Sequence, residues 1–255
     1  MKFVELQAIY VMWLRQMKRF GRAKSRIVAS IIQPLFFLFI LGSGFNIASF
    51  AGLEGEYIHF LAPGIIAMAI TLSSMFTGVS VLWDKQFGFL QEVLVAPISR
   101  LSIIIGRTLG GATTALFQGL IILVISLALG VTISSIGGLI ITLITMVLLS
   151  FTAVGFGLIF ASKMNDFQGF QVIMTLLIMP LFFLSSAFFP ISESLPSWLK
   201  AIAYVNPLFY MVDGLRGSLT GMNNVFPPLV DLAIIFFFCV VMMGLGSYFF
   251  SKSEV

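Results

Sequence analysis

The chain has 255 residues, of which 59% are hydrophobic and 9% are charged, with a mean hydropathy of +1.10 and a net charge of +4. Soluble domains are about 45–50% apolar, counting glycine, and about 25% charged. Several apolar runs also exceed the ~18 residues that mark a spanning helix, so the composition excludes a soluble domain and indicates an all-α polytopic membrane protein. With one cysteine, Cys239, and one histidine, His59, the chain has no basis for a disulfide framework or a thiolate metal site.

Residues 1–26 predict an amphipathic helix that lies in the membrane interface. An apolar stripe recurs at spacings of four and three, and a basic side accompanies it. The stripe is Leu6, Tyr10, Trp13, Met17 and Phe20, and the basic side is Arg15, Lys18, Arg19, Arg22, Lys24 and Arg26. Glu5 and Gln7 interrupt the apolar part and the basic residues follow it, an order that does not fit a signal peptide.

Six apolar segments are expected to cross the membrane. They are Ile27–Phe45, His59–Leu82, Leu101–Leu129, Ile136–Ser162, Phe167–Phe189 and Leu229–Phe250, joined by the connections Asn46–Ile58, Gly130–Ser135 and Lys163–Asp166. Pro34 and Pro180 fall inside the first and fifth segments, where neighbouring helices can compensate for a kink. Gly106 and Gly110 lie four residues apart in the third, a pattern that favours close helix packing.

The connection between the second and third spans, residues 83–100, reads WDKQFGFLQEVLVAPISR and predicts a short helix. Asp84 can cap its start, and Phe87, Leu90 and Leu94 fall on one face. Pro97 ends the helix before the next apolar run. We interpret this helix as the contact through which a partner in the aqueous phase moves the membrane part, and the alternative is an ordinary ordered loop.

Residues 190–227, before the last span, predict a pair of short re-entrant or interfacial helices. The first covers about Pro196–Val205. The second has Asn206 as its cap, Pro207 at its first position and Gly221 past its end. Each has about 10–15 residues, too few to cross a core ~30 Å thick. On the second helix, Asp213 and Arg216 are three residues apart and are expected to pair on one face, with a role in gating the outer exit as the functional alternative.

The basic residues predict the orientation. Segments 1–26, 83–107, 163–166 and 251–255 hold 7, 3, 1 and 1 of the chain's 14 Lys and Arg, and only Lys200 and Arg216 lie elsewhere. Because basic residues concentrate on the cytoplasmic side, both termini and the helix at 83–100 are expected to face the cytoplasm. Six spans, an even number, agree with this. We therefore expect a multi-pass protein of the cell membrane.

Few charges lie at bilayer depth. Arg107 and Asp231 fall near span ends, where both are expected to snorkel to the interface and to be structural. Without an acidic group near a midplane, a proton-driven or cation-driven carrier has no obvious coupling group. The sequence also has no G-x-x-x-x-G-K-[ST] phosphate loop, so energy for uphill transport would enter from another chain.

Polar residues inside the spans offer weak candidates for a substrate path. They more often hydrogen-bond between helices than contact a substrate. The candidates are Gln33, Thr71, Ser74, Gln171 and Thr175, with Ser73, Thr77, Gln118 and Gln168 as further polar positions. The 28 Phe and 13 Met residues suit an apolar or lipid-like cargo, and they suit lipid-facing packing equally well.

Three stretches together resemble the ABC-2 type transporter permeases, most closely the daunorubicin-resistance-type drug exporters; nodulation-factor and polysaccharide exporters belong to the same group. The stretches are YIHFLAPGIIAMAI, WDKQFGFLQEVLVAPISRLSIIIGR and FFPISESLPSWLKAIAYVNPLFYMVDGLRGSL. Asp84, Gly88, Leu94 and Pro97 match the family's D-x-x-x-G-x-x-x-x-x-L-x-x-P pattern, and Asn206, Pro207 and Arg216 match its outer motif.

The resemblance implies one transmembrane domain over residues 1–255, with two permease copies, expected to be identical, and two separate ATPase subunits. The helix at 83–100 would dock in a groove of the ATPase, through Asp84, Phe87, Gly88, Leu90, Glu92, Leu94 and Pro97. ATP and magnesium would be bound by the ATPase and no cofactor by this chain, which would be a transporter subunit and not an enzyme. No nucleic-acid partner is expected, since the basic residues follow the membrane topology.

Four functions stay open at this point. The leading one is export of a hydrophobic drug-like or lipid-like molecule, as in multidrug efflux. The others are export of a lipid-linked oligosaccharide, an ATP-independent carrier or channel, and a membrane scaffold. A neighbouring gene for an ATPase with a phosphate loop would separate the first two from the rest.

Overall fold

The computed structural model describes residues 2–44, 57–191, 196–222 and 224–252. Within these ranges the chain forms ten α-helices and no strand, in agreement with the expected all-α fold. The helices are α1 (Lys2–Arg22), α2 (Lys24–Gly44), α3 (Tyr57–Gln86), α4 (Phe89–Val95), α5 (Arg100–Ala128), α6 (Ile136–Lys163), α7 (Phe167–Phe183), α8 (Ser197–Val205), α9 (Pro207–Leu219) and α10 (Pro228–Ser251). The expected loop at 46–58 lies mostly outside the described residues.

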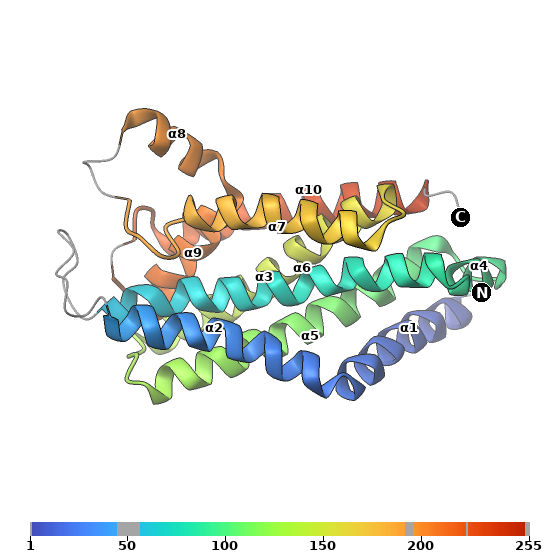
Figure 1. The fold of residues 1–255 in the computed structure, drawn as a ribbon, viewed down its shortest axis with the longest axis horizontal. Coiled ribbons are helices and arrows are strands. Elements are labelled where there is room, and N and C mark those ends of the chain that lie inside the picture. The colour runs from blue at the N-terminus through green and yellow to red at the C-terminus, as the bar shows by residue number, and fades with distance from the viewer. Residues whose placement is uncertain (1, 45–56, 192–195, 223, 253–255) are drawn as a thin grey trace.

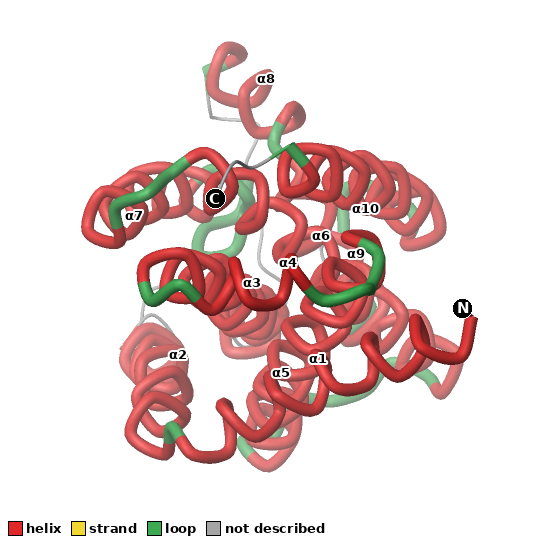
Figure 2. Tube along the Cα trace, turned by 90° about the vertical axis from the view of Figure 1, so that its right-hand side faces the viewer, coloured by secondary structure: helices red, strands yellow, loops and turns green. Residues whose placement is uncertain are grey.

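The long helices run side by side and form an elongated bundle (Figure 1). The start of α1, α4 and the end of α10 lie at one end of it, which we call the α4 end. The short helices α8 and α9 lie toward the other end, the α9 end. The view along the bundle in Figure 2 shows α3 among the other helices. In agreement, 83% of the most apolar stretch of α3 is buried in the molecule, against 17% for α10.

Four helices, α3, α5, α6 and α10, are long and apolar enough to cross a membrane. The bent pair of α1 and α2, which meet at 70°, passes the same test as one unit, and α7 is a shorter apolar helix. The polytopic membrane fold is thus confirmed. The expected second, third, fourth and sixth spans are among the four, whereas the first and fifth, at α2 and α7, remain predictions.

Close packing joins α1 to α5, as the two glycines of the third span predict. A Cβ atom built on Gly106 would lie 2.7 Å from the carbonyl oxygen of Ile9, and one on Gly110 would lie 2.6 Å from Cβ of Gln16. Neither position has room for a larger residue, so the backbones of α1 and α5 approach each other there. Helix α1 is therefore fixed to the spanning helix α5 by packing.

The chain between α7 and α8 departs from the sequence prediction. The fifth span was expected to reach Phe189, but α7 ends at Phe183. Ser186 has a φ of 58°, a conformation that a helix does not contain. A Cβ atom on Gly64 of α3 would lie within 2.8 Å of Cα of Ala187, so this turn packs directly on α3. Helix α7 stops because the chain turns inward toward α3 and α9.

Candidate functional site

The segment that joins α3 to α5 is built differently from its sequence prediction. Helix α3 continues through Asp84 to Gln86, so Asp84 does not cap the short helix, and that part of the prediction is wrong. The residue before α4 is Gly88, whose φ of 75° is in the left-handed region that favours glycine. Pro97 follows α4, and Ser99 caps α5 by accepting a hydrogen bond from the Ser102 N–H. Glycine and proline thus bound the seven residues of α4.

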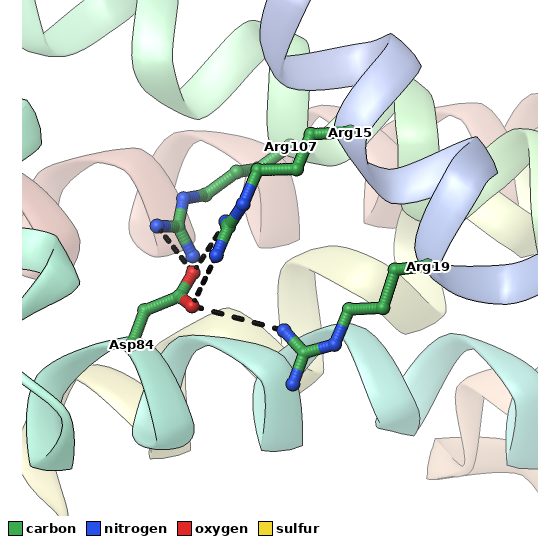
Figure 3. Close-up of polar contacts among 4 residues, drawn as sticks. All are labelled: Arg15, Arg19, Asp84 and Arg107. Atoms are coloured by element: carbon green, nitrogen blue, oxygen red, sulfur yellow. Dashed lines mark hydrogen bonds and ion pairs between the residues drawn. The ribbon is translucent and has the colours of Figure 1, made fainter. Parts of the chain in front are cut away.

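Asp84 is the centre of a partly buried ion cluster, which we call the Asp84 cluster: Asp84, Arg15, Arg19 and Arg107 (Figure 3). Its carboxylate accepts two hydrogen bonds from Arg15, at 2.7 and 2.9 Å. Nη2 of Arg107 lies 2.8 Å from Oδ2, and Nη1 of Arg19 lies 3.7 Å from Oδ1. These are the ion pairs found among the described residues, and they join α1, α3 and α5 at the α4 end.

Arg107 corrects a second prediction. It was expected to snorkel to the interface, yet its side chain is buried, with 3% of the residue exposed. Since a buried guanidinium without a counter-charge costs several kcal/mol, the ion pair with Asp84 explains why Arg107 stays inside. The position of a charged side chain within a spanning helix depends on its counter-charge. For Arg107 of α5, that counter-charge is Asp84 of α3.

A second polar contact fixes α1 to the start of α5. The Glu5 carboxylate accepts hydrogen bonds from the Ser99 N–H at 3.1 Å and from the Ser99 hydroxyl at 2.7 Å. The Ser102 hydroxyl donates to it as well. A carboxylate at a helix N-terminus satisfies free N–H groups and meets the positive end of the helix dipole. Both ends of the connection that carries α4 are therefore bound to α1.

The outer surface of α4 is partly apolar. Phe87 is 81% exposed and Val95 is 86% exposed, and Glu92 and Pro97 are exposed beside them. Phe89 instead lies under the guanidinium of Arg15, 3.7 Å from its ring centre. The side chains of Leu90 and Leu94 lie outside the described part of the structure. Phe87, Glu92 and Pro97 are thus exposed on α4 or beside it, while Asp84 is buried and Gly88 is half-buried.

The predicted substrate-path residues separate into two groups. Gln33, Gln171 and Thr175 line a cleft of about 330 Å³ between α2, α3 and α7, together with Ser30 and apolar side chains such as Phe170. Thr71 and Ser74 do not line this cleft. Each of these two buried hydroxyls donates to a carbonyl one turn earlier in α3. Their observed bonds support a structural role.

The α9 end holds the predicted outer motif. The Asn206 side chain accepts from the Leu208 N–H at 3.0 Å, and Pro207 begins α9, as predicted. Gly221, with a φ of 70°, follows the end of α9. The Asn206 amide also donates to the Leu181 carbonyl at 2.6 Å, which fixes α9 to α7. The sequence predicted the helix cap but not this second bond.

Asp213 and Arg216 do not form the predicted pair. Arg216 is 1% exposed and donates to the Phe60 carbonyl and to the hydroxyl and carbonyl of Ser186. Burial lowers the pKa of Arg216 to about 10, which leaves it charged at neutral pH. The Asp213 carboxylate accepts from the N–H groups of Val225 and Phe226, and burial raises the pKa of Asp213. Arg216 is bonded to Phe60 and Ser186, Asp213 is bonded to loop N–H groups, and neither is bonded to the other.

A family model described as "ABC-2 type transporter" matches residues 7–220 of the chain. This range includes α4, the Asp84 cluster, the cleft and the outer motif. The chain belongs to the ABC-2 type transporter family. The resemblance predicted from the three sequence stretches is thereby confirmed.

Curated ABC-2 relatives carry transport permease names. A "putative transport permease ycf38" of Porphyra purpurea is 31% identical over 83% of this chain and 73% of the relative. The "inner membrane transport permease YadH" of Escherichia coli K12 is 28% identical over 88% of this chain and 86% of the relative. A "probable multidrug ABC transporter permease YbhR" of the same strain is 31% identical, over 62% of this chain and 43% of the relative. This ABC-2 chain is thus a membrane permease of the ABC transporter class.

Sequence reasoning missed four polar residues of this ABC-2 permease: Glu5, Arg15, Arg19 and Arg107. The three arginines were interpreted as head-group or snorkelling residues, and Glu5 only as an interruption of the apolar part. One signal was available: Arg15 and Arg19 are four apart, so they share one helix face, and Asp84 and Arg107 lie near the same ends of consecutive spans. That arrangement places the three arginines and the Asp84 carboxylate at a similar depth in the membrane.

Proposed function

We propose that the chain is the membrane subunit of an ATP-driven exporter of the cell membrane, paired with a second permease copy and two ATPase subunits. The termini and α4 would face the cytoplasm. The observation that carries the proposal is the exposed, partly apolar surface of α4, held by Glu5, Arg15 and the Asp84 cluster to three helices of the bundle. A surface of this kind suits a contact that transmits force.

The path of the force follows from the contacts. An ATPase that grips Phe87 and Val95 would move α4, and Phe89 passes that movement to Arg15 of α1. From Arg15 the Asp84 carboxylate connects to α3 and, through Arg107, to α5. Because each link is a short ion pair or ring contact, the three helices would respond together. ATP and magnesium would be held by the ATPase.

The cleft between α2, α3 and α7 supports a hydrophobic cargo. Its volume of about 330 Å³ lies at the lower end of the ~300–1,000 Å³ found for small-molecule sites. The lining is mostly Phe, Met, Leu and Ile, with Gln33, Gln171 and Thr175 as the polar groups. Such a lining suits a drug-like or lipid-like molecule with a few polar atoms. The apolar, exposed outer face of α7 suits a second permease copy.

The test uses a charge on the α4 surface. Phe87→Asp should leave the permease folded and inserted but abolish co-purification of the ABC ATPase and cargo-stimulated ATP hydrolysis. Leu90→Asp and Leu94→Asp are expected to act in the same way. The matched control is Ile136→Asp, because Ile136 is 82% exposed, like Phe87, but begins α6 at the opposite end. Normal ATPase binding and hydrolysis in Phe87→Asp would refute the proposed contact.

A further inference from the structure

Asp231 lies in the first turn of α10 and is fully buried, with 0% of the residue exposed. Neither oxygen of its carboxyl group has a hydrogen-bond partner among the described residues. The sequence prediction that Asp231 snorkels to the interface is therefore wrong. The reason is that α9 covers it: a Cβ atom on Gly214 would lie 3.0 Å from Cβ of Asp231.

The charged and titratable groups of α9 near Asp231 do not neutralise it. Asp213 is close enough for the two carboxylates to repel each other. All the nitrogen groups of the Arg216 guanidinium are bonded to Phe60 and Ser186, away from Asp231. The Tyr210 hydroxyl donates to the carbonyl of Tyr204.

The other helices that pack on α10 hold their charges at the α4 end. The only charged residue of α6 is Lys163, its last residue, which lies over the ring of Phe249. Those of α5 are Arg100 and Arg107, and Arg107 lies near the ring of Phe250. Both rings belong to the last turn of α10, whereas Asp231 is in the first. No cation of the described residues of α5 or α6 therefore reaches Asp231.

The opposing energies favour a neutral carboxyl group. An ionised, unpaired carboxylate that is buried carries a large desolvation cost. The helix N-terminus near Asp231 offsets only part of that cost. A metal ion would need several oxygen ligands, and no group of three His, Cys, Asp or Glu residues that could hold one occurs among the described residues. A proton needs only the Asp231 carboxyl group to bind it, and it removes the buried charge.

We propose that Asp231 is a proton-binding site, protonated while α9 covers it, and that separation of α9 from α10 releases this proton to water. The covered arrangement is then stabilised by protonation. It loses stability as the pH rises, because the ionised carboxylate favours the separated arrangement. For a single proton, the ratio of covered to separated molecules changes by at most about tenfold per pH unit.

Infrared difference spectroscopy of the purified permease in lipid nanodiscs tests the site directly. The wild type should show the carbonyl band of a protonated carboxylic acid at neutral pH, and the band should disappear as the pH rises. Asp231→Asn should lack the component of this band that Asp231 contributes, whereas other carboxyl groups, such as Asp213, protonate at lower pH in both proteins. The control Asp166→Asn removes the exposed carboxylate that caps α7 and should leave the band unchanged.

Thermal unfolding provides a second measurement. Asn is neutral and nearly the same size as a protonated Asp, so Asp231→Asn should unfold at or above the wild-type temperature at neutral pH. It should also lose the part of the wild-type decrease in stability with rising pH that Asp231 contributes. Absence of an Asp231-dependent band at all pH values would overturn the proposal. Loss of the band on addition of sodium, potassium or calcium at constant pH would also overturn it, in favour of a metal cation site.

Discussion

The two ends of the bundle stabilise buried charge in different ways. At the α4 end, Asp84 is paired with arginines of two other helices. At the α9 end, Arg216 and Asp213 are bonded to backbone groups, Arg216 to the carbonyls of Phe60 and Ser186 and Asp213 to loop N–H groups. Both sets of contacts join elements that are far apart in the chain, since Arg216 of α9 reaches α3 and the turn after α7. The difference is that the α4 end joins its helices through paired opposite charges, whereas the α9 end joins its elements mainly through neutral backbone groups.

The largest effect is expected from Asp84→Ala, which removes the only carboxylate of the Asp84 cluster. Three guanidinium groups then face each other, and the buried Arg107 loses its counter-charge. Breaking a buried ion pair in this way costs about 3–5 kcal/mol. Thermal or denaturant unfolding of the purified permease measures the loss.

A double variant sharpens that prediction. Asp84→Asn with Arg107→Met removes the buried charge together with its counter-charge, so it should be more stable than Asp84→Asn alone. The control Asp166→Ala removes an exposed carboxylate that caps α7 and should cost about 1 kcal/mol. If the double variant were no more stable than the single one, the cluster would owe its stability to packing and not to charge.

The sequence predicted local features better than contacts between helices. Asn206, Pro207 and Gly221 define α9 through short-range rules for caps and turns, and α9 has these limits. The contact of Arg15 with Asp84 joins residues 69 positions apart, and nothing local specifies which helices meet. The same limit applied to Asp231, whose burial depends on α9.

The spans and the cleft illustrate this limit as well. Hydropathy found α3, α5, α6 and α10, because length and apolar composition are local properties. It did not find the end of α7, since the turn at Ser186 is held by Arg216, which follows later in the chain. Hydropathy also did not distinguish Gln171, which lines the cleft, from Ser74, which does not. Helix α3 has apolar residues on all sides, so its sequence pattern does not indicate which of its faces lines a cavity.

A smaller effect is expected at the α9 end, from Arg216→Met. The substitution removes a buried charge, but it leaves the carbonyls of Phe60 and Ser186 without their donor. Leaving buried acceptors unsatisfied costs about 1–3 kcal/mol, less than the loss of Asp84. Unfolding measurements on both variants under the same conditions compare the two ends directly.

Arg216→Lys distinguishes the charge from the bonds. Lysine keeps the charge, but it has a compact ammonium group and not the planar fork that reaches two residues at once. We expect it to lose nearly as much stability as Arg216→Met. Full stability of Arg216→Lys would show that charge alone matters at this end, and the contrast with the α4 end would fail.

The smallest effect is expected from Asn206, the residue that caps α9 and is also bonded to α7. Asn206→Ala loses the cap, which costs about 0.5–2 kcal/mol, and the bond to the Leu181 carbonyl. Asn206→Asp keeps an acceptor for the Leu208 N–H but has no amide to donate to Leu181. Unfolding of the two variants therefore separates the cap from the contact between helices. Because the cap is local to α9, we expect Asn206→Asp to retain most of the stability that Asn206→Ala loses. If Asn206→Asp were the less stable of the two, the bond between α7 and α9 would be the larger contribution of Asn206.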